Sequence, residues 1–423
     1  MLLKSSYETV SVIGLGYIGL PTAAAFAQRK VKVIGVDVNE HTVATINRGE
    51  IHIIEPDLDD AVYKAVNEGY LRATTVAEPA DAFLIAVPTP FKGDNHDPDL
   101  SYIEAASRAV ASVLKTGDLV VLESTSPVGA TEKMAQWLAE LRPDLSFPHQ
   151  KSEQSDIRVA HCPERVLPGQ VMREIITNDR IIGGMTPRCS REATDLYRTF
   201  VQGNCLASDV RTAEMCKLAE NAFRDVNIAY ANELSKICDT LGIDVWELIR
   251  LANRHPRVNI LQPGTGVGGH CIAVDPWFIV AGAPKEAQII RTARSVNDSK
   301  PDWVLAKIDD AVEEFTASMG RPPLIAALGL AFKANIDDLR ESPALHVAEQ
   351  LFARYGSRML VVEPHIDTPP PSMPSCTLAD IDRAATQADI IIVLVRHRLF
   401  EEYFAQTPLP SGKVAIDCVG IGL

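Results

Sequence analysis

The chain has 423 residues, which is too long for one ordinary hydrophobic core, so its length predicts two or three domains. Hydrophobic residues make up 46% and charged residues 23%, a balance that excludes a largely disordered or fibrous chain. Acidic residues outnumber basic ones, 55 to 41, and no dense Lys/Arg block occurs. The composition therefore disfavours nucleic acid and anionic membranes as partners, whereas a few local arginines can still hold an anionic small ligand.

The ends of the chain and its apolar runs predict where the protein resides. The segment MLLKSSYETVSVIGLG leads directly into a strand pattern and lacks the apolar region of a signal peptide. The longest apolar runs, such as IIIVLV at 390–395, have the length of a strand and not of a membrane span. Eight cysteines are scattered without a C-x-x-C pair, which argues against a disulfide framework or a zinc ribbon. These features predict a cytoplasmic protein without a metal centre.

Residues 1–207 alternate short β-branched runs with helical patterns. The runs VSVIGLG, VKVIGVDV, AFLIAVPT, LVVLEST, IRVAHCPE and RIIGG are apolar on both faces. Strands of a parallel sheet covered by helices on both faces have this character. The segment therefore predicts a doubly wound, Rossmann-like α/β domain with a mostly parallel sheet.

The fingerprint of a dinucleotide site lies at the start of this domain. Gly14, Gly16 and Gly19 form G-x-G-x-x-G after the first strand pattern, and Asp37 ends the second. Glycines in such a turn let a pyrophosphate approach backbone N–H groups at a helix N-terminus, and the acid accepts hydrogen bonds from ribose hydroxyls. Because a carboxylate repels a 2′-phosphate, the pattern favours NAD over NADP. The alternative is a glycine turn in an α/β domain that binds nothing.

Residues 208–315 have a helical texture. The stretch RTAEMCKLAENAFRDVNIAYANELSKICDTLG has no proline and its first glycine at Gly242, which predicts one long helix. A helix of this length suits a link between domains or packing against a second copy of the chain. A second α/β rhythm, PLIAALGLAF, RMLVVEP, ADIIIVLV and KVAIDCV, predicts a smaller Rossmann-like domain over 316–423. The second domain has no G-x-G-x-x-G of its own.

Two groups of residues in the middle segment are candidates for chemistry. Cys271 lies in the glycine-rich stretch GVGGHCIAVDP, where a thiol can come close to a ligand. A nucleophile and an inert cysteine are both open on sequence context, and a metal site with His270 lacks the usual ligand spacing. On the long helix, Lys217, Asn221 and Arg224 share one face, either as a pocket wall or as a solvated surface.

NAD and a nucleophilic thiol together indicate a specific reaction. A free aldehyde is a poor hydride donor, but a thiolate that adds to it forms a tetrahedral thiohemiacetal, which still carries the hydrogen. Loss of hydride from this adduct leaves a thioester that water hydrolyses. One cysteine thus permits a four-electron oxidation of an alcohol to an acid.

Seven motifs, in order along the chain, carry a resemblance to a known family. They are GLGYIGLP, AVPTP, ESTSPVGATEK, CPERVLPG, AEMCKLAENAFRDVNIAYANE, GVGGHCIAVDP and GLAFKANIDDLRESP. With them the chain resembles the nucleotide-sugar (UDP-sugar) 6-dehydrogenases nearly from end to end. The stretches NRHPRVNILQPGTGVGGHCIAVDPWF and CPERVLPGQVM are most similar to members that act on UDP-N-acetyl-D-mannosamine in the biosynthesis of a bacterial polysaccharide, enterobacterial common antigen.

The resemblance implies a role for each candidate catalytic residue. Cys271 matches the family's nucleophile, and Lys217 its lysine, which assists proton removal from the alcohol and stabilises oxyanions. Asn221 matches a residue that stabilises an oxyanion and positions the substrate. Glu164 and Asp275 match carboxylates that organise water and proton transfers during thioester hydrolysis.

The resemblance also implies which residues bind the ligands. Those expected to face NAD are Gly14, Gly16, Tyr17, Ile18, Gly19, Asp37, Thr89, Thr125, Thr131 and, from the second α/β domain, Arg340. Those expected to hold the sugar nucleotide are Arg165, Val166, Lys217, Asn221, Arg224, His255, Arg257, Gly268, Phe332 and Lys333. His255, Arg257 and Gly268 are expected to serve the site of the other subunit in a homodimer built on the long helix.

The overall activity implied is oxidation of C6 of UDP-N-acetylmannosamine to the uronate with two NAD per sugar. UDP-glucose or UDP-N-acetylglucosamine remains an alternative substrate, because the motifs specify C6 chemistry better than configuration at C2. A single-step hydroxyacid dehydrogenase would not need Cys271, and a noncatalytic nucleotide sensor would need none of the catalytic set. One departure concerns Cys418 and Val419, which stand where relatives often place a basic residue, so a substrate contact there is open.

Overall fold

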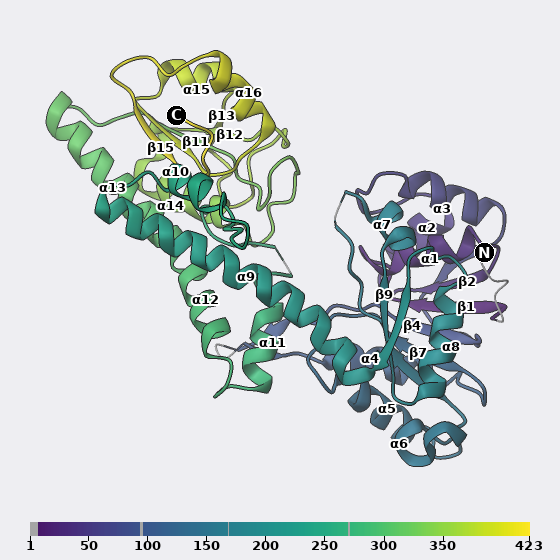
Figure 1. Cartoon of the computed structure of the whole chain (residues 1–423). Coiled ribbons are helices and arrows are strands. Elements are labelled where there is room, and N and C mark those ends of the chain that lie inside the picture. Colours follow the sequence, from purple (N-terminus) through teal and green to yellow (C-terminus); the bar gives the residue numbers. More distant parts are fainter. Residues whose placement is uncertain (1–6, 94–95, 168, 270) are drawn as a thin grey trace. The chain divides into compact units, whose positions relative to one another are not determined.

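The chain folds into two compact units, which are described separately. The computed structural model describes residues 7–93, 96–167, 169–269 and 271–423. The first unit holds Met1–Glu220 and Trp277–Pro284, and the second holds Asn221–Pro276 and Lys285–Leu423 (Figure 1). Within the described part of the chain, every helix is too short or too polar to cross a membrane.

The first unit is built on an eight-stranded sheet with the order β10-β9-β8-β7-β4-β1-β2-β3. Its strands are β1 (Thr9–Ile13), β2 (Lys32–Val36), β3 (Leu71–Thr74), β4 (Ala82–Ile85), β7 (Leu119–Leu122), β8 (Arg158–His161), β9 (Arg180–Gly184) and β10 (Cys205–Asp209). The sheet is parallel, as the apolar runs predict, except that β8 and β9 pair antiparallel. The run RIIGG indicated a strand but carried no information on its direction.

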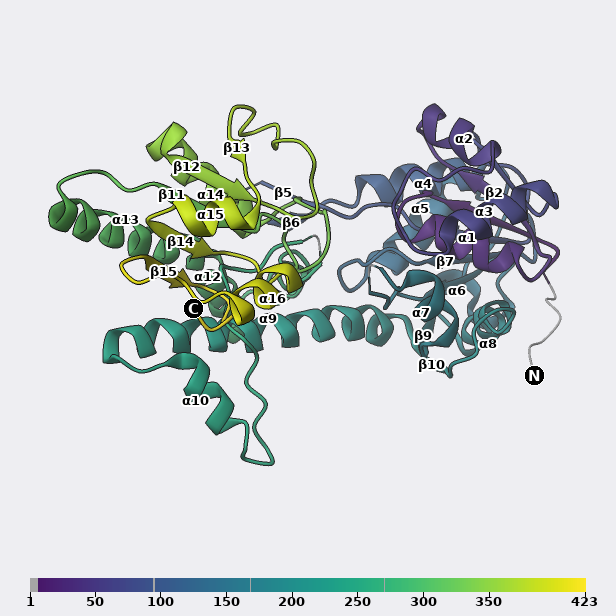
Figure 2. The same ribbon diagram turned by 90° about the horizontal axis from the view of Figure 1, so that it is seen from above.

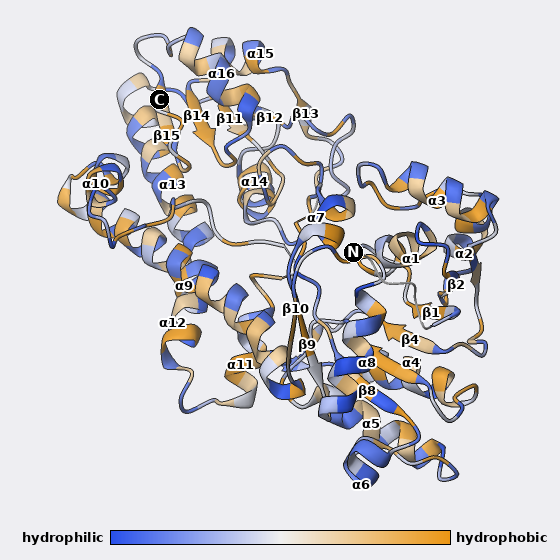
Figure 3. Ribbon diagram, turned by 45° about the vertical axis from the view of Figure 1, so that its right-hand side comes forward, coloured by the Kyte–Doolittle hydropathy of each residue, from blue (hydrophilic) through white to orange (hydrophobic). Residues whose placement is uncertain are grey.

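Helices cover both faces of this sheet and bury two hydrophobic cores. One core lies under α1 (Gly19–Ala27), α2 (Glu40–Asn47), α3 (Leu58–Asn67), α7 (Val171–Thr177) and α8 (Pro187–Tyr197), and the other under α4 (Ser101–Ala111) and α5 (Ala130–Leu141). The central strand β4 is hydrophobic along its length (Figure 3). The smaller elements are the antiparallel pair β5 (Phe91–Lys92) and β6 (Asp97–Pro98), α6 (Pro148–Lys151) and most of α11 (Asp275–Gly282).

The second unit contains a five-stranded parallel sheet with the order β13-β12-β11-β14-β15. Its strands are β11 (Ile325–Leu328), β12 (Met359–Val362), β13 (Thr377–Leu378), β14 (Ile390–Val393) and β15 (Val414–Asp417). The helices α13 (Lys300–Met319) and α14 (Pro343–Tyr355) cover one face, and α15 (Ile381–Gln387) and α16 (Arg398–Gln406) cover the other (Figures 1 and 2). The expected second Rossmann-like domain is therefore present.

The two sheets repeat one plan. In the first, β3-β2-β1-β4-β7 follow the same order as β13-β12-β11-β14-β15 in the second. The amide of Gly14 donates to Val36 O at 2.8 Å, and the amide of Gly329 donates to Val362 O at 2.8 Å. Both glycines have a left-handed φ, +91° and +92°. Each sheet thus begins with a strand, a glycine turn and a return to the end of the neighbouring strand.

The long helix is α9 (Val210–Leu241), and it ends where Gly242 adopts a φ of +68°. From Asn221 onward it belongs to the second unit, together with α10 (Val245–Ala252) and α12 (Gln288–Asp298). There Arg294 donates to Asp225 at 2.6 Å, and both side chains are buried. The buried ion pair and its hydrogen bonds hold α12 against α9, because an unpaired charge at this depth is strongly destabilising.

Candidate active site

The glycine turn after β1 leaves room for a phosphate. A Cβ on Gly14 would lie 2.6 Å from Ala86 O, and one on Gly19 would lie 1.8 Å from Gly14 O, so neither position accepts a side chain without a backbone shift. A Cβ on Gly16, by contrast, would meet no atom within 4 Å. The first and third glycines allow α1 to pack closely on the turn, and the second opens a space beside its N-terminus. This cradle fits the pyrophosphate of a dinucleotide.

Asp37 lies at the end of β2, beside the turn. Its carboxylate accepts hydrogen bonds from the amides of Leu15 and Asn39, both at 2.9 Å. The side chain is only half-buried, so ribose hydroxyls can reach its remaining lone pairs. His52 lies near Asp37, and burial outweighs the attraction of that carboxylate and lowers the pKa of His52. Sequence reasoning missed His52, because it follows α2 and carries no motif.

The three predicted threonines differ in their surroundings. The Thr89 hydroxyl donates to the carbonyl of Thr125, which joins the ends of β4 and β7. Thr131 is fully buried, and its hydroxyl donates to Glu214 of α9 at 2.6 Å. Glu214 also accepts from the amides of Gly129 and Thr131, at 2.6 and 2.8 Å. Thr131 therefore anchors the start of α5 to α9.

The CPER motif places a buried carboxylate at the end of β8. Glu164 is 5% exposed and forms a 2.6 Å ion pair with Arg180, the first residue of β9, which is also buried. Its second oxygen accepts from the amide of Arg165 at 2.7 Å. The Arg165 guanidinium turns away to Glu220 of α9, at 2.6 Å, and Val166 packs on the core. Sequence reasoning missed Arg180, which the antiparallel β8–β9 pairing brings beside Glu164.

A second buried carboxylate lies in the same layer. Glu123 follows β7 and accepts a 2.6 Å hydrogen bond from the hydroxyl of Tyr197. Burial, opposed in part by Arg180, raises the pKa of Glu123 to about 7. Two carboxylates thus interact with one buried guanidinium, and desolvation keeps a proton on Glu123 up to about pH 7.

The predicted polar face of α9 is divided between the two units. Lys217 is half-buried and belongs to the first unit. Asn221 and Arg224 belong to the second unit, where Asn221 is buried and Arg224 is exposed. The amide of Asn221 donates to a carboxylate oxygen of Asp275 at 2.5 Å.

Cys271 lies in a tight turn that also positions Asp275. The carbonyl of Cys271 accepts from the amides of Val274 and Asp275, at 3.2 and 2.9 Å, immediately before α11 begins. All eight cysteines are described and none of them forms a disulfide; Cys271 is the exposed one, whereas four are buried and three are partly buried. The turn therefore presents one accessible thiol next to the buried Asn221–Asp275 pair. His270 lies outside the described residues.

The glycine loop before Cys271 packs on a second loop of the same unit. A Cβ on Gly268 would lie 2.3 Å from Glu341 O, and one on Gly269 would lie 2.9 Å from the ring of Phe332. Gly268 is thus required by close contact with the backbone of the second loop, and Gly269 by its left-handed φ of +80° and the nearby Phe332 ring. Lys333 and Arg340 are exposed on the second loop, and Asp338 holds the Arg340 guanidinium at 2.6 Å. Gly268 and Phe332 are thus brought together within the second unit.

His255 and Arg257 form an exposed turn after α10. The amide of Arg257 donates to the His255 ring at 3.3 Å, and the amide of Val258 donates to His255 O at 3.0 Å. The turn lies in the second unit.

Cys418, which stands where relatives often place a basic residue, has a lysine nearby. Lys300 is buried, donates to the Ser235 hydroxyl at 2.6 Å and interacts electrostatically with Cys418. Burial lowers the pKa of Lys300 to about 8 and raises that of Cys418 to about 12.

Three family models match the chain in succession. They describe the NAD binding domain, the central domain and the UDP binding domain of the UDP-glucose/GDP-mannose dehydrogenase family, and match residues 8–201, 211–299 and 326–421. The chain belongs to this family. It is accordingly an NAD-dependent dehydrogenase, and the cradle at Gly16 lies within its NAD binding domain.

Relatives cover nearly the whole chain. It is 63% identical to a UDP-N-acetyl-D-mannosamine dehydrogenase of Escherichia coli, over 94% of this chain and 95% of the relative. It is 62% identical to an NDP-N-acetyl-D-galactosaminuronic acid dehydrogenase of Ralstonia nicotianae, over 98% and 96%. A solved UDP-D-ManNAc dehydrogenase of Pyrococcus horikoshii matches with a TM-score of 0.85 and 39% identity, over 98% and 96%. These matches extend through both units of the dehydrogenase.

Proposed function

We propose that this enzyme oxidises C6 of UDP-N-acetyl-D-mannosamine to the uronate, with two NAD consumed per sugar. The observation that carries the proposal is the exposed Cys271 thiol in a turn bonded to Asp275, the partner of Asn221. NAD accepts one hydride in each of two oxidations. The protein groups supply the proton transfers and the covalent attachment.

The first oxidation requires removal of the proton from the C6 hydroxyl. We assign this step to Lys217, whose neutral amine takes the proton; the ammonium formed in this way then stabilises negative charge on the oxygen. Asn221 is a second donor for this oxygen, with its orientation fixed by Asp275. The product of this step is the C6 aldehyde.

The second oxidation runs on Cys271. The sulfur adds to C6 of the aldehyde, the thiol proton leaves, and the oxygen becomes the hydroxyl of a thiohemiacetal. This carbon retains one hydrogen, and its departure as hydride, with loss of the hydroxyl proton, gives a thioester. An exposed cysteine is required here, because a buried thiol is inaccessible to substrate.

Hydrolysis completes the cycle. Water attacks the thioester carbon, the C–S bond breaks, and the thiol and the carboxylate are released. We assign orientation of the water to Glu164 and Asp275, both of which are buried and hydrogen-bonded. Arg180 pairs with Glu164 at 2.6 Å and so holds that carboxylate in a fixed position.

The remaining predicted residues are proposed as ligand contacts. Residues assigned to NAD are Gly14, Gly16, Tyr17, Ile18, Gly19, Asp37, Thr89, Thr125, Thr131 and Arg340, and those assigned to the sugar nucleotide are Arg165, Val166, Lys217, Asn221, Arg224, His255, Arg257, Gly268, Phe332 and Lys333. The corresponding division of the chain is 1–207 for NAD, 208–315 for dimerisation and catalysis, and 316–423 for the UDP-sugar. Each family model matches within one of these segments.

We propose a homodimer through α9. Four large apolar side chains at spacings of seven, seven and four residues are exposed on α9 beyond Asn221, namely Phe223 (69%), Tyr230 (52%), Ile237 (46%) and Leu241 (64%). Such a row is typical of a helix that packs on another helix. A second copy of the chain supplies that partner, and brings the exposed His255–Arg257 turn to the other subunit's site.

Replacement of the thiol tests the proposed chemistry. The Cys271→Ala variant is expected to bind NAD and UDP-N-acetylmannosamine but to form no uronate, measured by mass spectrometry of the nucleotide sugars. Cys418→Ala serves as the matched control and is expected to keep turnover. Wild-type rates of uronate formation by Cys271→Ala would contradict the proposal.

UDP-N-acetylgalactosamine is a second candidate substrate. The Ralstonia relative, which is named for an N-acetylgalactosaminuronic acid, is 62% identical to this chain, and the E. coli relative is 63% identical. These identities do not separate the two configurations. Side-by-side kcat/KM values for the UDP derivatives of N-acetylmannosamine, N-acetylgalactosamine, N-acetylglucosamine and glucose decide among them. The proposal expects the highest value for N-acetylmannosamine, and a higher value for another sugar would replace that assignment.

A further inference from the structure

The turn after β11 is fastened to a buried carboxylate. Glu363, which follows β12, accepts hydrogen bonds from the amides of Leu330 and Ala331 at 2.6 and 3.1 Å. Its other oxygen accepts from the amide of His365 at 3.1 Å. These bonds fix the first residues of the loop that carries Phe332 and Lys333.

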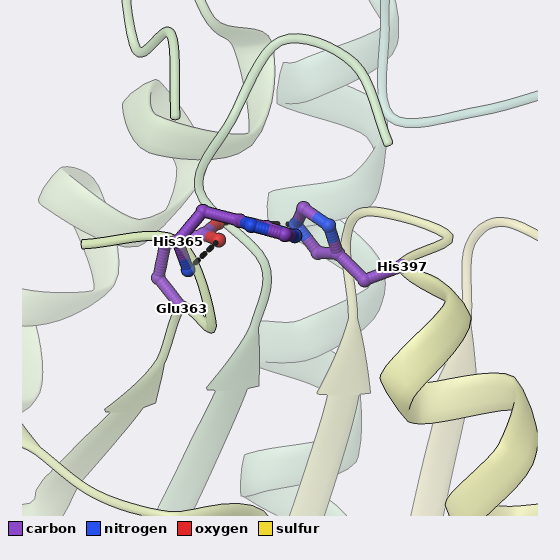
Figure 4. A group of neighbouring side chains, drawn as sticks. All are labelled: Glu363, His365 and His397. Atoms are coloured by element: carbon purple, nitrogen blue, oxygen red, sulfur yellow. Dashed lines mark hydrogen bonds and ion pairs between the residues drawn. The ribbon is translucent and has the colours of Figure 1, made fainter. Parts of the chain in front are cut away.

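His397 closes over the same carboxylate from the segment before α16 (Figure 4). Its Nε2 lies 3.1 Å from Glu363 Oε2, and both side chains are fully buried. Its Nδ1 accepts a 2.9 Å hydrogen bond from the amide of Asn335. Because Nδ1 must be an acceptor, the neutral ring carries its proton on Nε2 and donates it to Glu363.

This tautomer distinguishes a hydrogen-bonded clamp from a metal site. Ligand atoms of Glu363, His365 and His397 lie within 4.8 Å of one another, as those of a metal centre do. A protonated Nε2, however, offers no lone pair to a cation. Glu363 Oε2 is also occupied, since it meets two amides and His397. The side chains of Glu363 and His397 are therefore arranged for hydrogen bonding, and the His365 ring packs beside the ring of His397.

Asn335 ties the other end of the loop to the same place. Its backbone has a φ of +62°, a left-handed conformation that asparagine adopts more readily than most residues. Its side-chain oxygen accepts from the amide of Arg398, the first residue of α16, at 2.9 Å. The segment 330–335 is thus held at both ends by the Glu363–His397 pair and the start of α16.

The charge of Glu363 strengthens these bonds. Burial alone would raise its pKa, but the hydrogen bonds from His397 and from the loop amides lower it below its usual value. The carboxylate is therefore ionised, and hydrogen bonds to an ionised acceptor are about twice as strong as neutral ones.

We propose that Glu363, His397 and Asn335 form a clamp that positions Phe332 and Lys333 for the sugar nucleotide, with His397 and Glu363 as positioning residues. The ligand in this statement rests on the proposed function, whereas the ordering of the loop does not. The clamp is expected to act on the sugar nucleotide, because the segment that it holds, 330–335, contains Phe332 and Lys333 but not Arg340, the residue of this unit assigned to NAD.

The test compares variants at two histidines of the same cluster. In His397→Phe the ring volume is kept and both nitrogens are lost, so affinity for UDP, measured by calorimetry, is expected to fall tenfold or more with NAD affinity unchanged. Amide exchange at Leu330, Ala331 and Asn335 is expected to accelerate in the ligand-free variant. His365→Ala is the matched control and is expected to match the wild type in UDP affinity, because the bond from His365 to Glu363 comes from its backbone amide. The change removes the contact of its ring with that of His397, 5.0 Å between centroids, and leaves the His397 nitrogens in place.

A second pair of variants tests the clamp if the phenylalanine disturbs folding. His397→Asn puts an acceptor near the position of Nδ1, and His397→Gln puts a donor near Nε2. The clamp predicts slower exchange of the Asn335 amide and tighter UDP binding in the asparagine variant than in the glutamine variant. Equal UDP affinity and equal exchange rates of the loop amides in the wild type and all His397 variants would overturn the clamp. One equivalent of zinc bound to the wild type, but absent from both His365→Ala and His397→Phe, would also overturn it. If the wild-type protein bound no UDP, the assignment of the sugar nucleotide to this loop would be wrong, and the amide-exchange rates would still test the clamp.

Discussion

The turns that begin the two sheets share a backbone plan but use their acids differently. Asp37 accepts from the amides of Leu15 and Asn39, and Glu363 from those of Leu330 and His365, at matching positions of the two units. Asp37 remains half-exposed, whereas Glu363 is covered by His397.

The covering residue explains the difference. The amide of Ala86 donates to Ile13 O, and that of Leu394 donates to Leu328 O, so the two segments after β4 and β14 correspond. Three residues further on, the first unit has Thr89 and the second has His397. Thr89 bonds to Thr125 and leaves Asp37 accessible to a ribose. His397 points inward, bonds to Glu363 and covers it. A repeated scaffold therefore does not imply a repeated ligand mode.

The largest effect is expected from alanine at the two turn glycines. Gly14→Ala and Gly329→Ala each force a side chain into a left-handed backbone, 2.6 Å from Ala86 O and 2.5 Å from the Val395 side chain. Each change is expected to cost about 2–4 kcal/mol of unfolding free energy. Calorimetry should show Gly14→Ala losing NAD and Gly329→Ala losing UDP. Loss of the same ligand by both variants would contradict the assignment of one glycine turn to NAD and the other to UDP.

A smaller effect is expected from neutralising the two acids. Asp37→Asn is expected to raise KM for NAD about tenfold or more, since an ionic hydrogen bond to ribose is worth about 1.5–3 kcal/mol. Glu363→Gln is expected to raise KM for the UDP-sugar and to leave that for NAD unchanged. Steady-state kinetics with each ligand varied in turn measures both, and a change in KM for NAD in Glu363→Gln would count against a clamp confined to one unit.

A pH-dependent effect is expected at Glu123, the residue that follows β7. Because the pKa of folded Glu123 is raised to about 7, the folded protein keeps a proton that the unfolded chain releases above about 4.5. Glu123 therefore lowers stability as pH rises through this window. The melting temperature of Glu123→Gln relative to that of the wild type should rise as the pH increases from 5 to 7. A constant difference across that range would contradict the assignment.

The last prediction, which involves no change in the fold, concerns the reactivity of two thiols. Burial raises the pKa of Cys418 to about 12, whereas Cys271 is exposed. Iodoacetamide at pH 8 is expected to label Cys271 at least tenfold faster than Cys418 without unfolding the protein. Peptide mass spectrometry measures both rates, and equal labelling would remove the distinction between the two sulfurs.

Sequence patterns predicted the first turn well and the second only in outline. Gly14, Gly16, Gly19 and Asp37 form a local pattern whose geometry follows from chain direction and glycine chemistry. Glu363 and His397 are 34 residues apart and belong to no such pattern, so their contact appears only when β12 and β14 flank β11.

The same limit applies to the candidate catalytic groups. The motifs identified Glu164, Asn221 and Asp275, but Arg180 reaches Glu164 only through the antiparallel β8–β9 pairing, which apolar runs do not encode. The contact between Asn221 and Asp275 spans 54 residues and depends on where α11 begins relative to α9.

The most direct measurement is the ratio of NADH formed to uronate formed when a limiting amount of UDP-N-acetylmannosamine is turned over to completion. Absorbance at 340 nm counts the NADH, and mass spectrometry counts the uronate. A thiol that retains the half-oxidised sugar predicts two NADH per uronate, with no aldehyde released. One NADH per sugar, with the aldehyde as the final product, would contradict the role of Cys271.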